Sequence, residues 1–454
     1  MNSERENVLA LMGLGDLSGE QAKEKLSARV RLTVGAGQAA TALAHDITDL
    51  LNRSLTITDS LDCDLEIAIG SSFQSAAMHK MHLALSAEAL TITGDGAGGI
   101  DDQTPGIFRK IAACYAAGNA IARVVGGDRF QYLPSPFIVT FANLGVSPAD
   151  LAKPIQLDDP VLVGAGGVGN GFMWALAELP VSGRLTICDP KNIGGGNLNR
   201  CLYFAESEVG QKKAEVLASK TGRLGFEVVP FPGPFDDLLK QRTRIKRVIT
   251  TVDSRPARRA IQSGLPIEVL DASTTDLSAV VAHSHRQPTQ GACLSCIYSH
   301  IPVEDQHQKH VAEGLGLTEA EVKGAFISED VAEKLKANHP SLAGEDLVGK
   351  ALDTVYKEQC GNGVLLTPTG KQTVAPLAFI SNLAGAFLAL ELVRFELKKS
   401  PIGQSNYMTL DPWMPPHALA RRPRARNSDC EFCSKPLTRQ VMAAVWPEVD
   451  WPKE

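Results

Sequence analysis

The sequence lacks several features that would place it in a whole class of proteins. Acidic residues (51) outnumber lysine and arginine (45), and the formal net charge of −6 leaves no basic footprint for nucleic acid. No apolar run has the length that a bilayer requires, and the N-terminus, MNSERENVLA, does not resemble a signal peptide. We therefore expect a cytoplasmic protein that binds neither nucleic acid nor membrane.

Cysteine is also scarce, with nine residues in 454. In a reducing compartment, paired C-x-x-C spacings indicate a metal site, whereas lone cysteines indicate packing or catalysis. The hydrophobic fraction of 44% and charged fraction of 21% are typical of a globular chain. Its length predicts two or three domains, with enough residues to bury a sizeable core.

Residues 161–213 carry most of the chemical information. An apolar run enters a glycine cluster, a helical segment follows, and a strand at residues 184–188 ends at Asp189. The glycines are Gly164, Gly166, Gly167 and Gly169. This order predicts a βαβ unit whose loop and helix N-terminus bind phosphate, while Asp189 accepts hydrogen bonds from ribose. A tight turn in another α/β protein and an NAD(P) dehydrogenase are the alternatives.

Two basic residues beyond Asp189 favour a different nucleotide chemistry. An N-L-N-R element runs from Asn197 to Arg200, and a G-Q-K-K element ends at Lys213. A dinucleotide site has no need of these cations. A site that breaks ATP between its α- and β-phosphates does need them, because charge builds on the departing pyrophosphate. Arg200 offers a planar fork and Lys213 a movable point charge, while Lys212 stays unassigned.

In these elements the chain resembles the ThiF-type adenylating family. This family comprises the enzymes that activate ubiquitin and ubiquitin-like proteins and the adenylyltransferases of thiamine and molybdopterin sulfur carriers. The G-x-G-G-x-G, terminal Asp, N-L-x-R and G-x-x-K elements occur in the family's order. The resemblance implies that Asn197 belongs to the ATP site. It also implies that Asp253, which follows an apolar strand at residues 247–251, binds Mg²⁺ beside the α-phosphate.

Two C-x-x-C pairs predict a structural zinc site. They are Cys293 with Cys296 and Cys430 with Cys433. Each pair supplies two thiolates, and two such pairs complete a tetrahedral Cys₄ site around Zn²⁺ that leaves no open position for catalysis. Because the pairs lie far apart in the chain, the metal would tie the C-terminal region back to the domain. A redox C-x-x-C is the alternative.

Cys360 is the candidate nucleophile among the remaining cysteines. It opens a C-G-N-G-V-L segment before an apolar helix at residues 374–395, where family members with a covalent intermediate carry a similar cysteine. A thiolate of lowered pKa would attack an acyl-adenylate, and the glycines would let the loop move. A loop cysteine without function is the alternative. Packing is expected for Cys63, Cys114 and Cys188, and Cys201 follows Arg200 without a role in the family.

The segment at residues 297–372 is predicted to be a helical insertion that carries Cys360. Thr318 and Glu321 have the spacing of a capping box. The enlargement is typical of activating enzymes that present a catalytic cysteine to a partner. The histidines His300, His307 and His310 are expected at the surface.

The first 150 residues have the order of a degenerate copy of the nucleotide unit. A strand at residues 30–34 runs into Gly35-Ala-Gly37 and an Ala/Leu helix, but Gln38 replaces a glycine and the later motifs are absent. Residues 134–154 look like the connection to the second half. In the resembling enzymes an inactive half can supply an arginine to the ATP of its partner, and Arg5 is the candidate by position. An unrelated α/β domain is the alternative.

We predict an α/β protein with a doubly wound, Rossmann-like adenylation domain at residues 155–436. The domain holds a zinc staple and the helical insertion, and it is preceded by the degenerate α/β half at residues 1–150 and followed by a tail at 437–454. The cofactors implied are ATP, Mg²⁺ and structural Zn²⁺.

The function implied is activation of a ubiquitin-like protein. Its C-terminal glycine would be adenylated, moved to Cys360 as a thioester and handed to a conjugating enzyme. The alternative from the same family is an adenylyltransferase for a sulfur-carrier protein. An NAD(P)-dependent oxidoreductase is a more remote alternative, since it would leave Arg200, Lys213 and the cysteine pairs without a role. The active unit is either a monomer or a homodimer.

Overall fold

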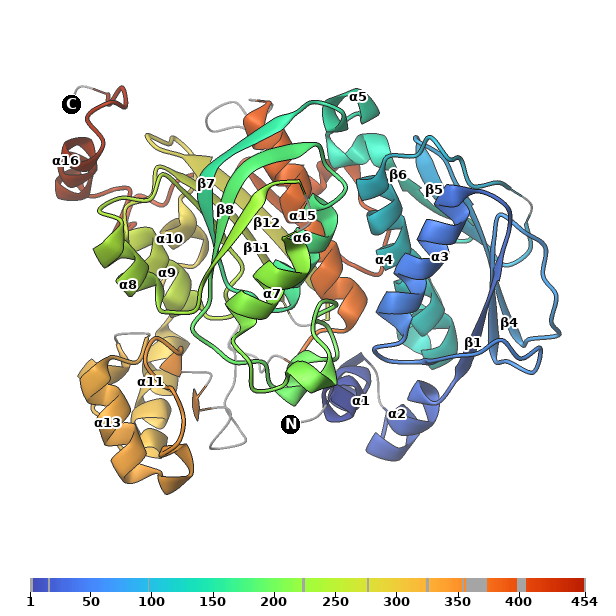
Figure 1. Ribbon diagram of the computed structural model, residues 1–454, viewed down its shortest axis with the longest axis horizontal. Helices are drawn as coiled ribbons and strands as arrows, with labels where there is room; N and C mark the ends of the chain where they lie inside the picture. The colour runs from blue at the N-terminus through green and yellow to red at the C-terminus, as the bar shows by residue number, and fades with distance from the viewer. Residues whose placement is uncertain are drawn as a thin grey trace.

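The structure is a computed structural model with two sheets side by side and helices packed between them (Figure 1). It describes residues 3–14, 17–96, 98–222, 225–275, 277–323, 326–352, 355–356, 374–397 and 406–452. The largest hydrophobic cluster contains side chains from both halves, so the two halves share one core.

The first half is built on a six-stranded sheet in the order β2-β1-β3-β4-β5-β6. The first four strands in this order are parallel, and β5 and β6 are antiparallel additions. The strands are β1 (Arg29–Val34), β2 (Thr56–Ile57), β3 (Leu65–Ile69), β4 (His79–Leu85), β5 (Ala89–Thr93) and β6 (Phe137–Thr140). The helices are α1 (Ser3–Leu14), α2 (Gly19–Leu26), α3 (Gln38–Leu51), α4 (Gly106–Val125) and α5 (Pro148–Leu151).

The second half contains an eight-stranded sheet in the order β14-β13-β12-β11-β10-β7-β8-β9. Strands β11, β10, β7, β8 and β9 are parallel, and the rest are antiparallel. The strands are β7 (Ile155–Val163), β8 (Val181–Cys188), β9 (Glu227–Phe231), β10 (Arg247–Thr250), β11 (Glu268–Thr275), β12 (Ala279–Arg286), β13 (Tyr407–Leu410) and β14 (Arg421–Arg422). The helices that pack on it are α6 (Gly167–Leu176), α7 (Lys213–Thr221), α8 (Phe235–Gln241), α9 (Arg255–Ser263), α10 (Leu294–Ile297) and α15 (Ala378–Glu396).

The chain reverses its direction of winding at β7. From β7 it proceeds outward to β8 and β9, and then it crosses back to β10 on the other side of β7. The carboxyl ends of β7 and β10 therefore border the switch point of the sheet, where α/β proteins bind their ligands. Register aligns the ends, because Val163 pairs with Cys188 on one side and with Thr250 on the other.

Helix α15 lies at the centre of the contact between the halves. It packs against α6 and α4 and against strands β11 and β12. Against α6 the contact involves backbone, since a Cβ added to Gly385 would lie 2.2 Å from the amide nitrogen of Phe172. The same helix meets the length and apolarity expected of a membrane span, contrary to the expectation from the sequence that no segment would. That window is wholly buried in the protein, as in a core helix of a soluble protein.

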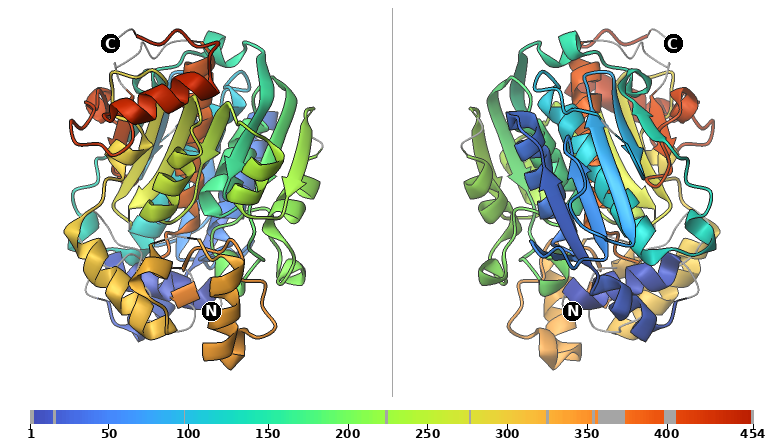
Figure 2. Two further views of the ribbon diagram at one scale, coloured as in Figure 1. Left: turned by 90° about the vertical axis from the view of Figure 1, so that its left-hand side faces the viewer. Right: turned by 90° about the vertical axis from the view of Figure 1, so that its right-hand side faces the viewer.

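The predicted insertion forms a helical unit with a small core of its own. It contains α11 (Pro302–Leu315), α12 (Glu319–Val322) and α13 (Glu329–Asn338), which pack around buried side chains such as Leu315, Leu335 and Leu352. Helix α12 has the predicted capping box of Thr318 and Glu321. The C-terminal α16 (Pro436–Val445) lies at the opposite end of the second half from the insertion (Figure 2).

The predicted α/β fold class is confirmed, including two sheets rich in parallel strands. The strand expected at residues 65–69 is β3 without change, and the other expected strands lie within or differ by one residue from observed ones. A second expectation was also wrong. Residues 134–154 are more than a connection, because Phe137 and Val139 point into the core and make β6 the edge strand of the first sheet.

The contact between α6 and α15 predicts that adding one methyl group at Gly385 destabilises the protein. Gly385→Ala should lower the free energy of unfolding by about 1–3 kcal/mol, since the neighbouring atoms are backbone and cannot rotate away. Urea denaturation would measure the shift in midpoint. The control is Gly99→Ala, at a position where an added Cβ meets nothing within 4 Å. Equal stability of both variants would contradict the packing argument.

Candidate active site

The glycine-rich loop joins the carboxyl end of β7 to α6. Gly164 has a φ of 105°, a conformation that disfavours side chains, and a Cβ on Gly169 would lie 2.2 Å from the carbonyl oxygen of Gly164. Gly167 fits between Ser381 and Arg200, which a Cβ would approach to 2.9 and 3.0 Å. A Cβ on Gly166, the N-cap of α6, would meet nothing within 4 Å. The loop therefore exposes backbone at a helix N-terminus, where anions bind.

Asp189 stands at the end of β8 and organises this loop. Its Oδ2 accepts a hydrogen bond of 2.7 Å from the amide of Ala165, and its Oδ1 accepts one of 2.8 Å from the amide of Lys191. The residue is buried. An ionised carboxylate has about four acceptor positions, so two remain for other donors. The role of Asp189 in binding ribose stays a prediction, and its contact with the loop is the role that the structure adds.

Three cations surround Asp253. The ammonium of Lys191 lies 3.6 Å from Asp253 Oδ2, and Lys191 and Lys213 are mostly buried, whereas 46% of the Asp253 side chain is exposed. Desolvation would raise the pKa of Asp253, but Lys191, Lys213 and Arg200 outweigh it and hold that pKa below its ordinary value. Asp253 is thus a carboxylate anion, which suits one ligand of a Mg²⁺ that also binds phosphates.

Lys213 is a buried cation held near carboxylates. It begins α7, and its backbone amide donates a 3.0 Å hydrogen bond to the carbonyl of Lys191. Burial lowers the pKa of Lys213, an effect that Asp189 and Asp253 oppose. Polyphosphate binding would give this ammonium additional negative partners. The sequence missed Lys191, although its place two residues after Asp189 puts it in the same loop.

Arg200 and its neighbours form a turn that packs against α15. The Arg200 guanidinium donates to the carbonyl of Gly196 at 3.0 Å and to Asn199 Oδ1 at 2.7 Å. Asn382 of α15 donates at 3.2 Å to the carbonyl of Arg200. Asn197 accepts from the amide of Gly194 at 2.9 Å, so its side chain shapes the turn. Its place in the ATP site stays a prediction.

The first half reaches this turn through an arginine that the sequence did not reveal. Arg53, just beyond α3, donates hydrogen bonds of 2.8 to 3.1 Å to the carbonyls of Leu198, Leu202 and Phe204. The candidate chosen from the sequence, Arg5, is exposed on α1, which packs against the 3₁₀ turn η3 (Gly195–Asn197). Arg53 therefore supports the turn that carries Arg200, and a role of Arg5 at phosphate stays a prediction.

The loop after β1 in the first half is filled by a carboxylate of the chain itself. Asp102 Oδ1 accepts a 2.8 Å hydrogen bond from the amide of Ala39, in the first turn of α3. A Cβ on Gly37 would lie 3.1 Å from the same oxygen. Because a phosphate would need these helix N–H groups, Asp102 supports the prediction that this half is degenerate.

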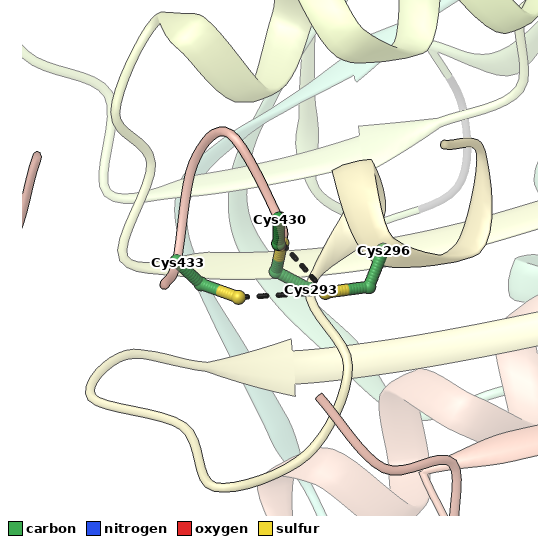
Figure 3. Close-up of side chains that lie close together, drawn as sticks. All are labelled: Cys293, Cys296, Cys430 and Cys433. Atoms are coloured by element: carbon green, nitrogen blue, oxygen red, sulfur yellow. Dashed lines mark hydrogen bonds between the residues drawn. The ribbon is translucent and has the colours of Figure 1, made fainter. Parts of the chain in front are cut away.

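Four cysteines form the second candidate site, a metal centre. The Sγ atoms of Cys293, Cys296, Cys430 and Cys433 all lie within 4.8 Å of one another, and all four residues are buried (Figure 3). Three of the separations are 3.7, 3.7 and 3.4 Å. A tetrahedral zinc with Zn–S bonds of about 2.3 Å requires roughly 3.8 Å between sulfurs. The donor set and the spacing thus fit the predicted Zn²⁺.

This cluster attaches the C-terminal segment. Around the thiols, Phe432, Met442 and Trp446 pack against Ile267. The indole N–H of Trp446 donates a 2.9 Å hydrogen bond to the carbonyl of Leu265. The tail is therefore folded onto the domain, with the cysteines at the junction.

Four of the remaining cysteines are buried in the protein, and the fifth lies outside the residues that the structure describes. Cys63, Cys114, Cys188 and Cys201 are buried. Burial raises the pKa of the Cys201 thiol even though Arg200 and Lys213 lie near it, which makes Cys201 a poor nucleophile. Cys360 lies outside the described residues, and its catalytic role stays a prediction.

The insertion is fastened to the domain beside Asp253. Glu304 of α11 accepts hydrogen bonds of 3.0 Å from Arg255 and 2.7 Å from Arg259, both on α9. The ammonium of Lys212, which the sequence left unassigned, lies 2.7 Å from Asp346. His300 is paired with Glu304 and Asp305, within 3.2 Å of each. The segment between the described parts of the insertion and α15 contains Cys360.

The sequence model of the ThiF family matches residues 143–432, well over half of the chain. The chain belongs to the ThiF family. The first half matches the E1 N-terminal domain at residues 2–147. The predicted family is confirmed, and with it an ATP-dependent adenylating enzyme of the E1-like type.

Individual ThiF relatives differ in how much of their length they share with the chain. The uncharacterized protein y4jF of Sinorhizobium fredii is 28% identical over 412 residues, covering 85% of this chain and 75% of that protein. The NEDD8-activating enzyme E1 catalytic subunit of Schizosaccharomyces pombe is 35% identical over 153 residues, 33% of this chain and 32% of its own. The chain thus spans about a third of that eukaryotic relative.

Among solved structures, the E. coli MccB structure with ATP covers 78% of this ThiF-family chain and 97% of its own. The sequence identity is 14% and the TM-score 0.38. A likeness at this level adds nothing to the family assignment.

The cysteine cluster predicts a zinc content that depends on each pair. Purified protein should contain about one zinc per chain, and Cys430→Ser should reduce that content to near zero and lower the melting temperature. Elemental analysis and thermal denaturation would measure both. Cys63→Ser is the matched control, since Cys63 is buried outside the cluster. A Cys430→Ser protein that keeps its zinc would contradict the assignment.

The cations around Asp253 predict how the site binds nucleotide. Lys213→Met keeps the apolar stem but removes the charge, and it should weaken binding of a non-cleavable ATP analogue with Mg²⁺ by at least about tenfold. Calorimetric titration would measure the dissociation constant. Lys220→Met, on the exposed part of the same helix, is the control. Equal losses in the two variants would remove Lys213 from the phosphate site.

Proposed function

We propose that this ThiF-family enzyme activates a ubiquitin-like protein. In this proposal it adenylates the C-terminal glycine of that protein, accepts the acyl group on Cys360 as a thioester and passes it to a conjugating enzyme. The observation that supports it most directly is the set of cations, Lys191, Lys213 and Arg200, around Asp253 at the switch point of the sheet. Its protein partners would be the ubiquitin-like protein, which is the carrier, and the conjugating enzyme, and the reaction would take place in the cytoplasm.

The first step would replace the bond between the α-phosphorus of ATP and pyrophosphate by a bond to the carrier's carboxylate. A carboxylate oxygen of the carrier attacks the α-phosphorus of ATP, the new bond gives an acyl-adenylate, and the bond to pyrophosphate breaks with the electrons leaving on pyrophosphate. Positioning and charge stabilisation would provide most of the rate. The loop at Gly166 would bind the phosphates, Lys213 and Arg200 would stabilise charge, and Asp253 would hold Mg²⁺ when it is bound.

The second step would move the acyl group to sulfur. The Cys360 thiolate attacks the acyl carbon, a thioester forms, and AMP leaves with the oxygen that carried the acyl group. The insertion supports this assignment because it is a separate helical unit that joins the domain beside Asp253 and leads directly to the segment with Cys360.

Adenylation for a sulfur-carrier protein is the second candidate. It shares the first step but passes the adenylate to a sulfur donor. The enlarged insertion and the match of the first half to an E1 N-terminal domain favour the ubiquitin-like route. Membership of the ThiF family argues against the NAD(P) oxidoreductase. The active unit is proposed to be a monomer or a homodimer.

A thioester assay with the Cys360→Ala variant tests the proposal. Wild-type protein with ATP, Mg²⁺ and a candidate ubiquitin-like protein should exchange pyrophosphate into ATP and form an adduct that thiol reagents release. Cys360→Ala should lose the adduct while keeping the exchange, and the control Cys63→Ala should keep both. An adduct that survives in Cys360→Ala would exclude that cysteine, and exchange without any wild-type adduct would favour the sulfur-carrier candidate.

A further inference from the structure

A cavity of about 260 Å³ lies beside the cysteine cluster, away from the candidate ATP site. One wall is the loop after β12, with Gln287, Pro288 and Thr289, and the other is the C-terminal segment around α16. We call it the tail pocket. Its volume is slightly below the range of about 300–1,000 Å³ that is typical for small-ligand sites, so it suits a small molecule.

The charged side chains that line the tail pocket are all positive, which favours an anion. Two arginines, Arg426 and Arg439, line it, and neither aspartate nor glutamate is among its described lining residues. Arg426 is half-buried and has no hydrogen bond or ion pair with another residue that the structure describes. A guanidinium in this position offers the planar fork that a carboxylate matches.

Gln287 provides an independent sign that a ligand is missing. The residue is 6% exposed, and its Oε1 accepts a 3.2 Å hydrogen bond from the amide of Thr289, which fixes the orientation of the side chain. Its Nε2 is buried and finds no acceptor among the described residues. A buried donor without an acceptor destabilises the folded protein, and a ligand oxygen in the tail pocket would accept its hydrogen bond.

Most of the remaining surface of the tail pocket is apolar, and its other polar lining residues, Thr289, Gln290, Thr438 and Gln440, are uncharged. Phe432, Met442, Trp451 and Pro288 line it. This lining favours an apolar group on the ligand and disfavours inorganic phosphate, since a doubly charged group would lose more hydration in such surroundings. A carboxylate attached to a small aromatic or aliphatic group satisfies both parts of the lining.

We propose that the tail pocket binds a small apolar carboxylate, with Arg426 and Gln287 as the groups that recognise the carboxylate. The apolar part lies against Met442 and Trp451. Because Phe432 and Cys433 line the same cavity, the ligand also joins the cysteine cluster to the C-terminal segment. This site is independent of the proposed adenylation chemistry.

Phenylacetate is the probe, and phenylacetamide is its uncharged match. Titration into the whole protein, followed by Trp fluorescence and calorimetry, should show binding of phenylacetate and at least about tenfold weaker binding of phenylacetamide. Arg426→Gln should weaken the binding of phenylacetate until its affinity equals that of phenylacetamide. The control is Arg422→Gln, an exposed arginine of β14 outside the pocket. Trp451→Phe should remove the fluorescence change and retain the calorimetric heat.

The source of the carboxylate is tested by a second ligand. An acetylated dipeptide that ends in a free phenylalanine carboxylate binds as tightly as phenylacetate if the pocket receives a peptide C-terminus, and more weakly if it receives a free acid. Equal affinity for phenylacetate and phenylacetamide would overturn the proposal. So would an Arg426→Gln variant that binds phenylacetate unchanged, or inorganic phosphate that competes for the site at equal concentration.

Discussion

The close contact of α6 with α15 fixes most of the geometry on which the site depends, and it is possible because glycines stand where the two backbones touch. Gly171 and Gly385 let the backbones touch. This places α15 beside the first turn of α6, so that Ser381 borders Gly167 and Asn382 holds the carbonyl of Arg200. The same helix packs on α4 of the first half. The buried helix α15 thus contacts the glycine-rich loop, the turn that carries Arg200 and the first half of the protein.

The electrostatics of the site follow from this arrangement. Burying Lys213 and Lys191 is costly unless anions are close, and Asp189 and Asp253 provide them. The two carboxylates therefore oppose the lowering of the Lys213 pKa that burial causes, and they hold the cations in place before a nucleotide arrives. A site organised in advance loses little free energy to rearrangement when charge develops on a leaving pyrophosphate, which is the electrostatic requirement for adenylation.

The two halves illustrate how one fold supports different roles. In the second half the helix N-terminus after β7 opens to solvent at Gly166, whereas in the first half Asp102 occupies the corresponding position. The first half contributes Arg53, which binds three carbonyls of the turn that carries Arg200. It also shares the hydrophobic core. Among the described residues, the first half therefore supports the turn that carries Arg200 and completes the hydrophobic core.

The sequence alone was sufficient to predict those parts of the protein that short, continuous motifs encode. Glycine spacing, the strand before Asp189 and the paired cysteines predicted the fold class and the four thiols that meet, since each reflects short-range geometry or a repeated ligand spacing. Tertiary packing alone revealed Lys191 as the partner of Asp253, Arg53 as the support of the Arg200 turn and Asp102 as the occupant of the first loop. Those contacts join residues that lie far apart in the sequence and meet only in the folded chain, and no local spacing encodes which distant side chain fills a given space.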